Sequence, residues 1–101
     1  MENIALISEF KQNMGDNVIA YVEKDKVYEL TLRVNGMPRV RFHLQDENTG
    51  EYILCINKIT TMITGQYTYK FKVPQPSLLV YESDGNGIVY IDHVAVLEGV
   101  L

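Results

Sequence analysis

Apolar and polar residues alternate along several stretches of the chain. Between residues 67 and 73, aromatic and aliphatic side chains alternate with Thr and Lys, and residues 28–34 show the same period of two. This period is typical of a β-strand that buries one face. Residues 39–46 follow it as well, with Val40, Phe42 and Leu44 on one side. We therefore predict strands in all three stretches, and no segment shows a convincing helical period.

Short groups of turn-forming residues separate these stretches. Asn35-Gly36 is the strongest short hairpin signal, although Met37-Pro38 makes the loop longer than two residues. Residues 83–87 read Ser-Asp-Gly-Asn-Gly and tolerate positive φ, so we predict a second chain reversal there. Residues 47–50 turn the chain again.

The regular spacing of strands and turns predicts an all-β, antiparallel β-sandwich of about eight short strands. At 101 residues the chain forms a single domain, residues 1–101. Residues 11–17 read as a loop. Asn57-Lys58 interrupts one strand, so that Ile59 to Ile63 can pair elsewhere. The predicted strands cover residues 3–10, 17–22, 28–34, 39–46, 52–56, 67–73, 78–81 and 88–97.

Composition narrows the function classes. No apolar run approaches the roughly 20 residues that span a bilayer, and no secretory signal precedes the first strand, so we expect a soluble protein made in the cytoplasm. The net charge of −4 argues against nucleic acid or an anionic membrane as the main partner. The single cysteine, Cys55, lies in an apolar run and is expected to be a small buried hydrophobe.

Three consecutive segments in the C-terminal half of the chain together carry a resemblance to a known family. Residues 67–74 read Tyr-Thr-Tyr-Lys-Phe-Lys-Val-Pro, residues 78–81 precede a glycine-rich turn, and residues 89–96 read Val-Tyr-Ile-Asp-His-Val-Ala-Val. Residues 26–32 and 3–10 look like the early core strand and the opening strand of the same pattern. The set resembles jelly-roll carbohydrate-binding modules, whose relatives are also common in phage tail and capsid-associated proteins. The resemblance implies that the sandwich is a jelly roll.

The resemblance also bears on metal binding. Members of this family often hold a structural calcium ion between a carboxylate just after the opening Phe and the Asp of the terminal strand. Asp92 is present here, but Lys11 occupies the other place. Asp92 is therefore only a weak metal candidate, and we predict no metal and no cofactor. The chain also has no Trp, the residue most often stacked on a sugar ring.

One face of the predicted sheet is polar and partly cationic. Its candidate ligand-binding residues, which offer forked donors for carboxylates or sugar hydroxyls, are Arg33, Arg39, Arg41 and His43. The alternative interpretation is a solvated sheet face on which these residues form cross-strand pairs with Glu29 and Glu51.

No residue pattern indicates catalysis. Asp92 and His93 are adjacent, but neighbours along a strand point to opposite faces, so we expect a structural Asp at a bulge or strand end instead of a dyad. We predict that the protein is not an enzyme. Of the tyrosines, the core is expected to hold Tyr28, Tyr67 and Tyr69, while no role is assigned to Tyr21, Tyr81 and Tyr90.

Two functions fit these observations. The first is a virion structural or decoration protein of phage type, which docks to other protein subunits and can form a homo-oligomer. The second is a carbohydrate-binding module that recognises a glycan through the polar face or the loops. The first predicts exposed apolar side chains that an oligomer buries, and the second predicts a polar, aromatic-lined groove on a monomer.

Overall fold

The fold is all-β and antiparallel, as predicted. The computed structural model describes residues 2–11 and 17–97, which contain strands and no helix. Accordingly, no helix in this part of the chain could span a membrane. All six strands belong to one sheet and pair only antiparallel. They are β1 (Glu9–Phe10), β2 (Val18–Val22), β3 (Val27–Asp46), β4 (Tyr52–Thr61), β5 (Gly65–Lys72) and β6 (Ser77–Val96).

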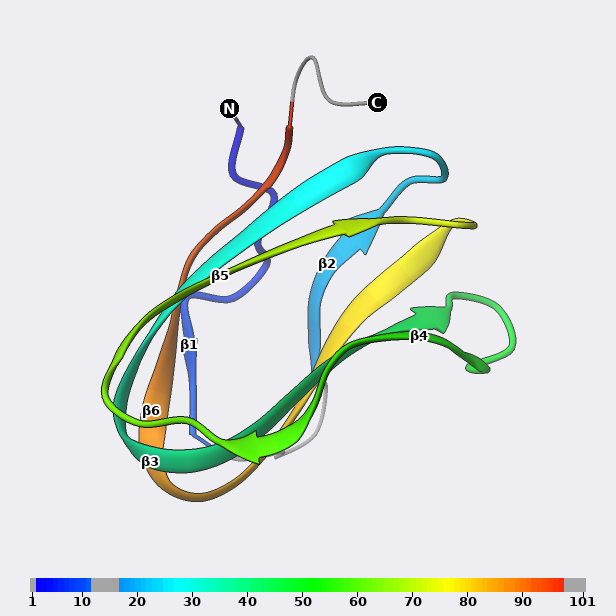
Figure 1. The fold of residues 1–101 in the computed structure, drawn as a ribbon. Helices are drawn as coiled ribbons and strands as arrows, with labels where there is room; N and C mark the ends of the chain where they lie inside the picture. The colour runs from blue at the N-terminus through cyan, green and yellow to red at the C-terminus, as the bar shows by residue number, and fades with distance from the viewer. Residues whose placement is uncertain (1, 12–16, 98–101) are drawn as a thin grey trace.

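Two long strands form the centre of the sheet (Figure 1). β3 and β6 have 20 residues each and pair along nearly their full length, from Tyr28 opposite Val96 to Asp46 opposite Ser77. On the far edge of β3 lie β5 and then β4, and on the far edge of β6 lie β1 and β2. The central pair thus positions every other strand.

The two central strands bend together at a pair of glycines. Gly36 lies directly opposite Gly87, and both have positive φ, 110° and 151° respectively. A Cβ on Gly36 would lie only 2.8 Å from the Cα of Gly87, so any residue other than glycine would clash at this position. In Figure 1 both strands turn back at the lower left. We call this bend the crease; it separates half-sheet I (β1, β5, residues 27–34 and 88–96) from half-sheet II (β2, β4, residues 39–46 and 77–83).

Neither predicted chain reversal is a turn that ends one strand and begins the next, so both are wrong as predicted. Asn35-Gly36 lies inside β3, and residues 83–87 lie inside β6. The glycines adopt positive φ, as predicted, but each strand continues beyond them because the other strand supplies its hydrogen-bond partners. At the crease the two paired strands bend together, so the sheet folds back without ending either strand.

Other boundaries also differ. Residues 59–61 do not pair elsewhere: they continue β4 along β3 through a bulge at Asn57, whose Oδ1 accepts a hydrogen bond from the Phe42 amide at 2.8 Å. The opening strand shrinks to β1, although the Ile4 amide still bonds the Val94 carbonyl at 2.8 Å. Most of the predicted 11–17 loop lies outside the described residues.

The core fills the space between the two half-sheets. Even-numbered side chains of β3 face inward from Tyr28 to Leu44, and Leu30, Leu32, Val40, Phe42 and Leu44 are completely buried. The Phe42 ring meets Phe10 of half-sheet I edge to face, with ring centroids 6.3 Å apart. One curled sheet thus encloses one core, and the sandwich and jelly-roll assignments remain predictions.

Candidate functional site

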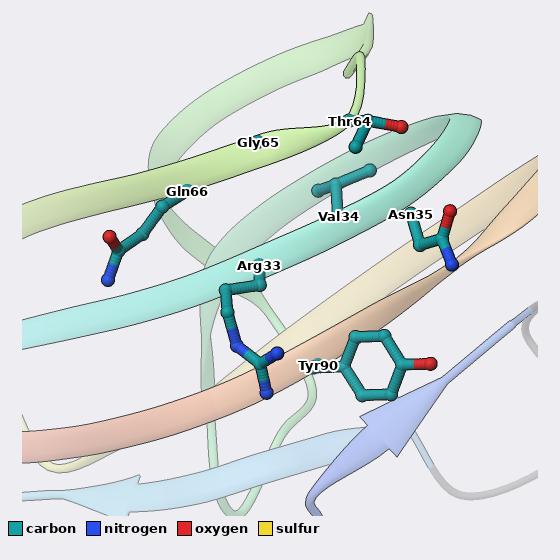
Figure 2. Close-up of a pocket in the computed structure, with 7 residues that line it drawn as sticks. All are labelled: Arg33, Val34, Asn35, Thr64, Gly65, Gln66 and Tyr90. Atoms are coloured by element: carbon teal, nitrogen blue, oxygen red, sulfur yellow. The ribbon is translucent and has the colours of Figure 1, made fainter.

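A polar row crosses the outer face of half-sheet I. Gln66 on β5, Arg33 on β3 and Tyr90 on β6 are register neighbours, so their side chains lie side by side. The Arg33 guanidinium lies over the Tyr90 ring, 5.0 Å from its centroid. Beside the row is an open hollow of about 400 Å³, which Asn35 and Thr64 also line (Figure 2). It combines one aromatic ring with several hydrogen-bonding groups.

A β-bulge shapes the region below this row. Thr31 pairs with His93 while Leu32 pairs with Ile91, which leaves Asp92 without an opposite residue. As a result Asp92 and His93 do not point to opposite faces: the Asp92 carboxylate accepts hydrogen bonds from Arg33 Nε, and His93 Nε2 lies 3.2 Å from Thr31 Oγ1 on the same outer face. The prediction of opposite faces is wrong, whereas the prediction of an Asp at a bulge is confirmed.

The metal candidate has a protein partner. Arg33 Nε donates to both Asp92 oxygens, at 2.9 and 3.2 Å. Lys11, at the position of the second expected carboxylate, is exposed, and its carbonyl accepts a hydrogen bond from Ser83 Oγ at 2.9 Å. Within residues 2–11 and 17–97, no three His, Cys, Asp or Glu side chains form a group that could hold a metal ion.

The crease divides the four predicted ligand-binding residues. Arg33 lies on half-sheet I, whereas Arg39, Arg41 and His43 lie on half-sheet II. Each arginine faces a carboxylate on β6: the Arg39 and Asp84 groups are 3.6 Å apart, and Arg41 forms an ion pair with Glu82.

These ion pairs bear on the alternative interpretation. Cross-strand pairing is present, but the predicted partners Glu29 and Glu51 are wrong, because the register between β3 and β6 selects the acids of β6. Glu29 instead faces His93, at 3.8 Å. The four residues do not form one platform.

His43 is buried under an aromatic ring. Only 6% of His43 is exposed, and its ring stacks on Tyr52 with centroids 5.5 Å apart. Burial, followed by the nearby Arg41 charge, lowers the pKa of His43. Cys55 lies opposite His43 and is half-buried, and its hydrogen bond with Tyr52 raises the pKa of the Tyr52 hydroxyl. A neutral, covered imidazole is a poor ligand-binding group for an anion.

The outer edge of β4 carries a feature that sequence reasoning missed. Among the described residues β4 pairs only with β3, so its other edge is open. Lys58 is the one charged residue among the ten of this strand. Its exposed large apolar side chains, together with Ile63 just beyond it, are Tyr52, Leu54, Ile59 and Ile63. In the sequence, the low charge of residues 52–63 could have indicated this exposed apolar strand.

The other edges of the sheet are shorter or more highly charged. β1 has two residues and β2 has five. β5 has eight residues but carries Lys70 and Lys72, and lysine on an edge strand discourages pairing with another chain. β4 is therefore the longest of these edges and carries one lysine, although a bulge at Asn57 interrupts it.

The sequence matches no protein-family model, and its comparison with curated proteins gives no significant match.

Proposed function

We propose that the protein is a non-enzymatic assembly module that docks to other protein subunits through the open edge of β4. The observation that carries this proposal is the combination of an open ten-residue strand edge with exposed apolar side chains on the same strand. Such an edge offers unpaired backbone donors and acceptors to a strand of another chain. Proteins commonly cover this kind of edge, and here a partner subunit would cover it.

The resemblance adds detail to this proposal. A jelly-roll sandwich is compatible with two half-sheets that face each other across one core. In this setting the module is a virion structural or decoration protein of phage type, and its work is docking. Catalysis plays no part in this proposal.

Light scattering during size-exclusion chromatography tests the docking proposal. We expect an oligomer whose fraction rises with concentration, and we expect Ile59→Lys to shift it toward monomer, because the lysine places a charge in the docking surface. Tyr21→Lys is the matched control, since Tyr21 is also an exposed large apolar residue but lies on β2. A strict monomer at all concentrations would refute docking between copies.

A second candidate function is glycan recognition by the hollow on half-sheet I. It is favoured by the row of Gln66, Arg33 and Tyr90, which presents amide, guanidinium and phenol groups toward an open surface. Polar side chains that converge beside an aromatic ring can bind sugar hydroxyls and an apolar ring face. However, Arg33 already covers one side of the Tyr90 ring.

Affinity electrophoresis against a polysaccharide panel tests this second function. We expect Tyr90→Ala to raise the dissociation constant for a retarding polysaccharide about tenfold or more, because the substitution removes the aromatic wall of the hollow. Arg41→Ala is the control, since Arg41 lies on half-sheet II. Equal losses in both variants would argue against a site in this hollow.

A further inference from the structure

β4 is the strand that the core of the protein holds least firmly. None of its ten residues is buried, whereas every other strand contributes at least one buried side chain. The β4 side chains that pack partly against the core are Ile53 and Ile56. The pairing of β4 with β3 shifts register at three places between Val40 and Gln45. A strand with few buried side chains and an irregular ladder can open locally at a lower free-energy cost than the whole domain.

This loosely held strand covers an ionisable side chain of β3. His43 lies on the outer face of half-sheet II, yet only 6% of it is exposed. Its ring stacks on Tyr52 of β4, and Cys55 of β4 is its register partner. On the other side its register partner is Val80 of β6, which is also buried. Because two of the residues around the imidazole belong to β4, its enclosure depends on β4 being in place.

The surroundings of the imidazole disfavour a proton. Its Nδ1 is buried and has no hydrogen-bond partner among the described residues. The groups that face it are Arg41 and Gln45 on β3, Glu82 on β6, and Tyr52 and Cys55 on β4. The negative charge of Glu82 is already engaged in the ion pair with Arg41. A proton on the ring would therefore place a second positive charge beside Arg41 in a largely dehydrated position.

We infer that protonation of His43 releases β4 from β3, so that this strand is a pH-sensitive element of the fold. In the released state the imidazole reaches water and titrates near its ordinary pKa of about 6.5, whereas in the closed state it stays neutral. The released state thus binds more protons. The closed strand is fully favoured above about pH 6.5 and loses stability as the pH falls.

The release has a defined end. Just beyond β4, the side chain of Met62 is buried in the core, and its amide donates to the Pro38 carbonyl at 2.9 Å. The second half of β3 also keeps its pairing with β6 when β4 leaves. This inference concerns how β4 is held to β3 and does not depend on what docks at its outer edge.

Hydrogen exchange of single amides, followed by nuclear magnetic resonance, tests the inference. The reporter is the Phe42 amide, which donates to Asn57 Oδ1 on β4 at 2.8 Å. From pH 7.5 to 5.5 its protection, corrected for the intrinsic exchange rate at each pH, should fall by up to about tenfold. The amides of Met62 and of Val73, which donates to the Lys26 carbonyl at 3.1 Å beside half-sheet I, should keep their protection.

The two histidines of the chain provide matched variants. His43→Gln should remove the fall at the Phe42 amide, because glutamine does not titrate. His93→Gln makes the same substitution on half-sheet I and should leave the fall as in the unmodified protein. Circular dichroism verifies that both variants fold, and the contrast between the three amides of the unmodified protein requires neither variant.

Each outcome decides the inference. Equal protection of the Phe42 amide at both pH values would overturn it. An equal fall at all three amides would do the same, because that result describes unfolding of the whole domain. A local fall that persists in His43→Gln would show that another group is responsible. A fall confined to the Phe42 amide and removed only by His43→Gln would establish the release of β4.

Discussion

Replacing Gly87 with alanine tests whether the crease depends on paired glycines. At this position φ is +151°, a conformation that residues with a side chain rarely adopt. The added Cβ would also lie 2.6 Å from Pro38 Cδ and 2.7 Å from the Asn35 carbonyl oxygen. Both contacts come from β3, so the partner strand would have to move.

The expected cost follows from these two effects. Backbone strain of this kind costs about 1–3 kcal/mol, and forcing a methyl group into packed surroundings costs about 1–3 kcal/mol. Since the strand can relieve part of both, we expect a total loss of about 2–4 kcal/mol. For a domain of this size the melting temperature would fall by about 10–25 °C.

Urea unfolding followed by circular dichroism measures this loss, and two other glycines calibrate it. Gly65→Ala should change stability by no more than about 0.5 kcal/mol, because φ is not positive there and a Cβ would meet nothing closer than 3.9 Å. Gly50→Ala should cost about 1 kcal/mol through its φ of +75° alone. If Gly87→Ala behaved like Gly65→Ala, the account of the crease would be wrong.

Three further predictions concern the core, a buried imidazole and a surface ion pair. Phe42→Ala should cost about 3–5 kcal/mol in urea unfolding, because this fully buried ring joins both half-sheets, whereas Ile63→Ala should cost under about 1 kcal/mol. The lowered pKa of His43 means that the unfolded chain takes up its proton first, so stability is present above pH 6.5 and is lost as pH falls through the folded pKa. His43→Gln should reduce this loss between pH 7.5 and 5.5, and an unchanged loss would contradict the assignment. A double-mutant cycle on Arg33 and Asp92 should give a coupling below about 1 kcal/mol, because Arg33 is 57% exposed, and a larger value would show a more rigid pair.

Local alternation was enough to predict several strands and their inward faces. The patterns of residues 67–73 and 28–34 predicted β5 and the first part of β3 to within two residues, because burial of one face imposes a period of two wherever the strand pairs. The clearest error concerned the glycines. Positive φ is required both in a hairpin loop and at a bend within a strand, and the choice depends on which distant segment supplies hydrogen bonds. Here residues 35–38 of β3 pair with residues 85–88 of β6.

The candidate site could be predicted only as far as single residues. Odd-numbered positions of β3 point outward, as expected, and this placed Arg33, Arg39 and Arg41 on the outer surface. Whether they share one platform depends on the crease, which separates Arg33 from the others. Their carboxylate partners depend on the register of β6, a long-range property. A bulge likewise placed Asp92 and His93 on the same outer face.

The facing glycines also bear on how the chain finds its register during folding. A ladder between two twenty-residue strands could slip by two residues and still keep its apolar face inward. Such a slip would place Gly87 opposite a residue with a side chain, and the bend could not close. Contacts between strands so distant in sequence form slowly, which lengthens the time in which a slipped ladder could persist. The crease thus selects the register: only the alignment that places Gly36 opposite Gly87 lets the sheet bend and the two half-sheets pack against each other.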